Sequence, residues 1–238
     1  LDGGLHATDF PGSQQLDELV YQLASRTDDE VERILDDDIV LVAVANPDGM
    51  DLVADWYAAH GNLDLPVLYQ RYAGHDDNRD FYFGALAETR NVNRVLYREW
   101  YPQIVYDHQQ TGRRGAVMFA PPFRDPFNYY LHPNVPAGID ALGAAMAQRF
   151  IDEGKPGVTS RRAENYSTWW NGGLRTTADF HNMIGLLTET IGSPSPVTVP
   201  FVAARQVPDS SQGWPIAPQT AWHLRQSVDY SMTANFAV

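Results

Sequence analysis

The chain of 238 residues contains no cysteine. Disulfide frameworks and zinc sites built from thiolates are therefore both excluded. A zinc ion bound by this chain would have to use imidazole and carboxylate ligands, which are the other donors that zinc takes in proteins. The candidate metal ligands are thus the histidines, aspartates and glutamates.

Basic residues are scarce. The sequence has 17 Lys and Arg against 30 Asp and Glu, which gives a formal net charge of −13. Proteins that bind nucleic acid normally present a basic face to the phosphates. The charge balance therefore argues against a nucleic-acid partner.

Long apolar runs are missing as well. None approaches the roughly 18 residues that a membrane-spanning helix needs, so we expect no membrane span in this segment. The sequence starts at Leu1 and shows no signal-peptide pattern. We therefore expect it to be cut from a longer chain, with any targeting segment outside it.

The sequence has enough apolar residues for a sizeable core, because 44% of them are hydrophobic and 12% aromatic. The length allows one large domain or two small ones. We expect a single domain over residues 1–238. Within it, the helix predicted at 220–236 either closes the domain or leads into a following one.

Apolar spacing predicts an alternation of helices and strands. Residues 39–45 form a continuous, β-branched apolar run that ends at the turn Asn46-Pro47-Asp48-Gly49. Such a run is typical of a strand buried on both faces of a mostly parallel sheet. We expect further strands at 103–108 and 181–189, and helices at 50–60, 85–100, 139–153 and 220–236. The region 13–35 is also expected to be helical, with Ser13 as cap, a break at 26–29 and a second short helical segment at 30–35. This alternation predicts an α/β domain.

Two histidines and an aspartate are candidate zinc ligands. His6 and Asp9 are three residues apart, and His108 is the last residue of a predicted strand. Ligand sites gather at the carboxyl ends of parallel strands, and a catalytic zinc usually has three such protein ligands. The alternative is that His6 and His108 are ordinary polar residues with only structural hydrogen bonds.

Other polar residues suggest further roles. Glu189 ends a predicted buried strand, where it either acts as a general base or simply reaches solvent. Asn78 and Arg79 could hold a carboxylate by forked hydrogen bonds, although a surface arginine among acidic neighbours is common. Asp76 could orient a ligating histidine.

Taken in order, these motifs resemble the zinc carboxypeptidase (peptidase M14) family. His6-Ala7-Thr8-Asp9 is similar to the family's His-x-x-Glu ligand pair, and Asn46 to Gly49 is similar to its turn after a central strand. Asp76-Asp77-Asn78-Arg79 resembles its Asp-x-Asn-Arg motif. Asp107-His108 resembles its third-ligand region, and Thr188-Glu189 resembles the strand that carries its catalytic glutamate.

The resemblance implies a three-layer α/β/α fold with a mixed, mostly parallel central sheet. It implies one zinc ion on His6, Asp9 and His108, with Glu189 as general base. It implies that Asn78 and Arg79 bind the substrate's terminal carboxylate and that Tyr166 covers the substrate. The family's arginine that polarises the scissile carbonyl has no clear match in this sequence, and Arg71 is one candidate for it.

The sequence departs from the family pattern in two places. Asp9 stands where the family has Glu, and an aspartate is shorter by one C–C bond, roughly 1.5 Å. In addition, only Leu1 to Leu5 precede the ligand pair, where the family has further strands. We therefore expect the domain to lack its N-terminal strands.

The function that the resemblance implies is hydrolysis of the C-terminal peptide bond of a peptide or protein. A zinc-dependent deacylase or amidohydrolase of the same fold is one alternative. A non-catalytic domain that binds peptides or glycans is another. The resemblance also implies a secreted or periplasmic location.

Overall fold

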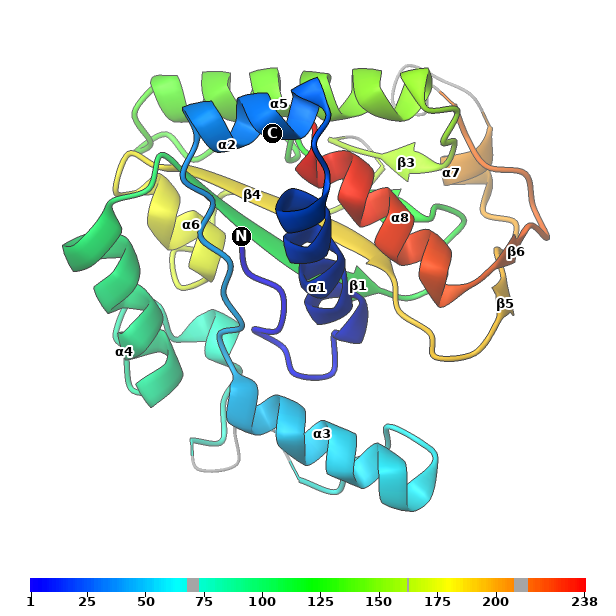
Figure 1. The fold of residues 1–238 in the computed structure, drawn as a ribbon, viewed down its shortest axis with the longest axis horizontal. Helices are drawn as coiled ribbons and strands as arrows, with labels where there is room; N and C mark the ends of the chain where they lie inside the picture. The colour runs from blue at the N-terminus through cyan, green and yellow to red at the C-terminus, as the bar shows by residue number, and fades with distance from the viewer. Residues whose placement is uncertain (68–72, 162, 208–213) are drawn as a thin grey trace.

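The computed structural model describes residues 1–67, 73–161, 163–207 and 214–238 (Figure 1). Its centre is a four-stranded sheet in the order β1-β4-β2-β3. The strands are β1 (Ile104–Thr111), β2 (Met118–Phe119), β3 (Val158–Thr159) and β4 (Ile184–Ile191). Strand β4 is parallel to β1 and antiparallel to β2, and β2 is parallel to β3. The predicted mixed, mostly parallel sheet is confirmed.

Helices cover both faces of this sheet. Tyr106 and Leu186 belong to a core cluster that also holds residues of α5 (Asn134–Asp152) and α8 (Leu224–Asn235). Val105 faces the other way and packs with residues of α6 (Leu174–Asp179). Helix α1 (Phe10–Ser25) lies beside α8 (Figure 1). The predicted arrangement of helix, sheet and helix layers is therefore present.

The first residues of the chain extend the sheet at its β1 edge. Asp2 forms parallel bridges with Asp107 of β1 on one side and with Ala43 on the other. Residues 1–3 are thus held between β1 and the segment around Ala43. This pairing fixes the start of the chain beside β1, and the turn that contains His6 follows directly after it.

The buried strand predicted at 39–45 is wrong. Only the bridge at Ala43 forms there, and Ile39 is 76% exposed and Val44 38% exposed. The segment lies at the outer edge of the extended sheet and pairs only with the first residues of the chain. Its other edge and several of its apolar side chains are therefore exposed to solvent. A continuous apolar run indicates a strand but cannot tell whether neighbours cover it.

The predicted helical region 13–35, with its break at 26–29, forms two helices, α1 and α2 (Asp29–Asp37). Helix α1 begins earlier, at Phe10, with a proline in its first turn and Asp9 at the N-cap position. Proline suits the first turn of a helix, because the amide hydrogen that it lacks would have no helical partner there. Ser13 therefore lies inside the helix and does not cap it.

The remaining helices agree with prediction in place but differ in their bounds. Helix α3 (Pro47–His60) starts at the predicted turn, where the Asn46 side chain accepts a hydrogen bond from the Gly49 amide at 2.9 Å. Helix α4 (Ala87–Arg94) continues into a π-helical turn, η2 (Val95–Trp100). Short elements complete the chain: η1 (Asp77–Arg79), α7 (Ala203–Gln206), β5 (Val197–Thr198) and β6 (Ala221–Trp222).

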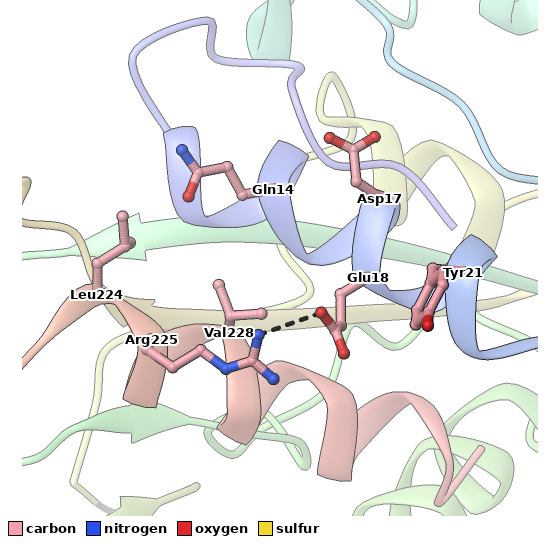
Figure 2. A pocket seen from close by; sticks show the side chains of 7 residues that line it. All are labelled: Gln14, Asp17, Glu18, Tyr21, Leu224, Arg225 and Val228. Carbon is pink, nitrogen blue, oxygen red and sulfur yellow. Dashed lines mark hydrogen bonds and ion pairs between the residues drawn. The ribbon is translucent and has the colours of Figure 1, made fainter.

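A groove runs between α1 and α8 (Figure 2). An ion pair of 3.1 Å between Arg225 and Glu18 crosses it. None of the site residues predicted from the sequence lines this groove. Within the described residues, no helix combines the length and apolar character needed to span a bilayer.

Candidate active site

His6 and Asp9 face each other in a tight turn at the edge of the sheet. The Asp9 amide donates to the His6 carbonyl at 2.8 Å, and His6 Nδ1 lies 3.5 Å from Asp9 Oδ2. The Gln110 amide also donates to Asp9 Oδ2, at 3.1 Å, which fixes the carboxylate against β1. The two predicted ligands are therefore brought together.

Asp76 holds the other side of the His6 ring, with its Oδ1 2.8 Å from His6 Nε2. Burial disfavours a charged His6, but the hydrogen bonds to Asp76 and Asp9 outweigh it and raise the pKa of His6 to about 11. Burial likewise opposes ionisation of Asp76, yet its bond to His6 lowers the pKa of Asp76 to about 2. The short contact between the two side chains thus favours the charged form of each.

Among the described residues, His6, Asp76 and Asp77 are the set of three whose ligand atoms lie within 4.8 Å of one another. Both carboxylates already accept the Asn78 amide hydrogen, at 2.8 and 2.9 Å, where η1 begins. Asp77 is fully buried and also accepts from Asn46. These contacts suit carboxylates that support the His6 ring and η1 rather than an ion.

His108, the third predicted ligand, does not join this group. It lies in the middle of β1, where its Nδ1 is 3.1 Å from the Thr188 hydroxyl and its ring is 4.0 Å from that of Tyr106. Successive side chains of a strand point to opposite faces. Since Tyr106 packs with α5 and α8, His108 faces that side, and burial lowers its pKa to about 3.

Asp107, Gln109 and Glu189 share the opposite face. Gln109 is in register with Glu189, and its side-chain amide donates to Asp107 Oδ2 at 2.8 Å. Asp107 is 1% exposed, and its Oδ1 has no hydrogen-bond partner in the described part of the chain. Strand β1 therefore offers the site a carboxylate and an amide in place of an imidazole.

Glu189 is 6% exposed. Burial, followed by the charges of Asp9 and Asp107, raises the pKa of Glu189 to about 8. Burial and the charge of Asp2 also raise the pKa of Asp107 to about 8. Carboxyls with raised pKa values near a histidine–carboxylate pair mark a candidate catalytic site.

Asn78 and Arg79 lie at the rim. The Asn78 Oδ1 accepts from the Leu174 amide at 2.9 Å, which ties η1 to the start of α6. Arg79 is exposed, and one of its guanidinium nitrogens donates to the Asn78 carbonyl at 2.8 Å. The guanidinium thus remains accessible to a ligand.

Tyr166 lies close to Glu189. Burial raises the pKa of the Tyr166 phenol, and the Glu189 carboxylate raises it further. The Tyr166 ring stands 4.5 Å from that of Phe119 in β2. The other arginine considered from the sequence, Arg71, is outside the described residues.

Arg175 is a site residue that the sequence did not suggest. It comes from α6 and lies near Asp107 and Glu189, whose charges partly offset the burial that lowers the pKa of its guanidinium. The sequence of residues 154–178 predicts no regular element, and an arginine there carries no motif. The only available signal was its position upstream of Glu189 in a segment rich in aromatic residues.

Comparison with known proteins places these features in a family. A sequence profile of the zinc carboxypeptidase (peptidase M14) family matches residues 1–179. No curated protein sequence matches the chain.

Solved structures share the fold at low sequence identity. A metallo-carboxypeptidase from Burkholderia cenocepacia aligns over 99% of this chain with a TM-score of 0.61 and 16% identity. Bovine thrombin-activatable fibrinolysis inhibitor, solved in complex with tick carboxypeptidase inhibitor, aligns over 99% with a TM-score of 0.53 and 12% identity. The chain spans 54% of the first of these proteins and 79% of the second. The matched profile and the shared fold agree, and the chain belongs to the zinc carboxypeptidase family.

Proposed function

We propose that this chain forms the site of a metal-dependent carboxypeptidase that removes the C-terminal residue of a peptide or protein. The observation that carries the proposal is the buried Glu189, which lies on the α6 side of the sheet close to His6 and Asp9. A buried carboxylate with a raised pKa, beside a histidine–carboxylate pair, suits a general base.

The chain offers donors for one zinc ion. His6 Nδ1 and Asp9 Oδ2 are 3.5 Å apart, close to the roughly 3.3 Å expected for two ligands in tetrahedral zinc coordination. Asp107, whose Oδ1 has no hydrogen-bond partner among the described residues, is the third donor that we assign in place of His108. Its carboxylate would have to turn toward the pair, because in the described part of the chain only His6, Asp76 and Asp77 bring three ligand atoms within 4.8 Å of one another. A zinc ion held there would supply Lewis acidity, which lowers the pKa of bound water and polarises a carbonyl.

Side chains of the protein would transfer the proton and cover the substrate. Glu189 accepts a proton from the attacking water at a carboxylate oxygen and later donates it to the nitrogen of the leaving amine. Its pKa, raised to about 8, lies near neutral pH, so the ionised fraction can accept the proton and the protonated form can release it. Tyr166, beside Glu189, covers the bound substrate.

Asn78 and Arg79 would fix the end of the substrate. A guanidinium binds a carboxylate with two parallel hydrogen bonds, which gives both affinity and orientation. The exposed Arg79 can receive the terminal carboxylate, and Asp76 steadies both Arg79, at 3.8 Å, and His6. This grip places the last peptide bond of the substrate at the site.

The experiment is hydrolysis of short peptides by zinc-supplemented protein, with free or amidated C-termini and with or without chelator. We expect release of the last residue from the free peptides only, and loss of that release with chelator. Cleavage that persists in chelator, or cleavage of amidated peptides at the same rate, would contradict the proposal.

A second candidate function is binding of peptide C-termini without hydrolysis. The observation that favours it is His108, which faces α5 and α8 and leaves the predicted set of ligands incomplete. This second function predicts that purified protein binds peptides with free C-termini, does not retain zinc and does not cleave the peptides.

The secreted or periplasmic location stays a prediction from the family, and fractionation of native cells would test it.

A further inference from the structure

Within the described residues, no carboxylate forms an ion pair with the guanidinium of Arg175. One terminal nitrogen, NH2, donates to the Ser167 carbonyl at 2.8 Å, and the group lies 4.1 Å from the centre of the Phe123 ring. The other, NH1, is buried and has no hydrogen-bond partner among the described residues. Arginine has donors on each nitrogen in a fixed fork, so NH1 has hydrogen-bonding capacity that the described residues leave unused.

The carboxylates around Arg175 do not satisfy it. Asp179, Asp107 and Glu189 are near enough to influence its charge, but within the described residues none of their oxygens pairs with the guanidinium. Asp179 Oδ1 instead accepts the Gly185 amide at 2.8 Å. A buried charge is costly unless it is paired and hydrogen-bonded. An anionic group that paired with the Arg175 guanidinium would therefore lower the cost of burying its charge.

Arg175 is adjacent to the residues that we assign to the substrate's terminal carboxylate. Asn78 binds the amide of Leu174, the residue before Arg175 in the chain. Arg79 is exposed at the rim, whereas the NH1 of Arg175 is buried. A terminal residue held at Asn78 and Arg79 by its main-chain carboxylate could thus turn its side chain inward to Arg175.

We propose that Arg175 makes the site selective for substrates whose C-terminal residue has an acidic side chain, glutamate or aspartate. The inference rests on the proposed function, because it uses the same grip on the terminal carboxylate. The substrate's side-chain carboxylate displaces the side chains that cover NH1 of the guanidinium and pairs with it. Arg175 is then a specificity residue and takes no part in proton transfer.

The experiment measures binding of acetylated tripeptides that differ only in their last residue, which is Glu, Gln or Leu. A fourth peptide ends in Glu with an amidated C-terminus. Calorimetry with the Glu189→Gln variant avoids turnover during the titration. We expect the Glu peptide to bind about 10- to 100-fold more tightly than the Gln peptide, as for hydrogen bonds to a charged group.

Variants assign the preference to Arg175. Arg175→Met, made in the same background, should bind the Glu and Gln peptides equally, and Arg175→Lys should keep part of the difference. Arg225→Met, which removes a guanidinium in the groove between α1 and α8, is the matched control and should keep all of it. Melting temperatures show whether each variant folds. The comparison of the Glu and Gln peptides with the protein that keeps Arg175 does not depend on the variants.

The outcomes separate the two proposals. Equal binding of the Glu, Gln and Leu peptides, or preference for Leu, overturns the role of Arg175 and leaves the carboxypeptidase proposal intact. Equal binding of the free and amidated Glu peptides shows that the terminal carboxylate is not recognised, and overturns both. A preference for Glu that survives Arg175→Met also overturns the inference.

Discussion

Gln109 of β1 and Glu189 of β4 are partners in the parallel register and face the same side of the sheet. His108, one residue before Gln109, must face the other side, where Thr188 and Tyr106 contact it. This relationship decides which side chains meet His6 and Asp9. It makes the site richer in oxygen donors than the sequence suggested.

Metal binding should depend on His6 and not on His108. We expect His6→Ala to weaken zinc binding at least about 100-fold, since a ligand is lost, as measured by calorimetry against a competing chelator. His108→Gln keeps a hydrogen-bonding group for Thr188 and should bind zinc within about threefold of the unaltered chain. A large loss in His108→Gln would show that His108 is a ligand after all.

Replacement of Glu189 should remove catalysis and spare binding. Glu189→Gln keeps the side chain's size and cannot accept the proton of water. We expect kcat to fall about 10²- to 10⁴-fold, the usual contribution of a general base, with KM nearly unchanged. Steady-state kinetics on a peptide with a free C-terminus is the measurement. A kcat within tenfold of the unaltered protein would exclude Glu189 as the base.

Arg79 should determine whether the protein distinguishes a free from a blocked C-terminus. Arg79→Ala should lower kcat/KM for free peptides by about 10- to 100-fold, because a charge-assisted hydrogen bond is lost. Any residual rate on amidated peptides should stay the same, because they lack the carboxylate that Arg79 would bind. An unchanged preference for free C-termini in Arg79→Ala would instead favour a deacylase or amidohydrolase that lacks this grip.

The stability of the fold should depend on pH through Asp179. Burial raises the pKa of Asp179 to about 7, although Arg175 opposes the shift. Because the folded-state pKa exceeds the ordinary value of 3.8, ionisation costs folding free energy progressively as pH rises from about 4 to about 7. Asp179→Asn removes this cost and can still accept the Gly185 amide.

The expected result is a melting temperature that is a few degrees higher for Asp179→Asn than for the unaltered protein at pH 8. At pH 4 the two should melt together. Thermal unfolding by circular dichroism across this pH range is the measurement. Parallel pH profiles for the two proteins would show that Asp179 does not titrate in this window.

The fold could be predicted from the sequence because its signals are local. The helices follow apolar spacing, and the run that contains Leu186 and Leu187 does form the central strand β4. The segment 39–45 has the same kind of signal and is nevertheless an exposed edge. Burial depends on which segments pair with it, and the local pattern does not contain that information.

The site was harder to predict because it depends on strand alternation. The sequence suggested a strand that ends at His108, whereas β1 continues to Thr111. A residue at a strand end can turn toward a site, but a residue in the middle of a strand is fixed to one face. Arg175 was missed for a different reason, since α6 is a six-residue helix in a region with no periodic pattern.

The most direct test of the account is the position of zinc in a crystal of the protein grown or soaked with zinc, located by anomalous scattering. The account predicts one strong peak about 2.0–2.2 Å from His6 Nδ1 and Asp9 Oδ2, on the side of the sheet that carries Glu189. A peak at His108, or no peak under conditions where zinc is in excess, would contradict it.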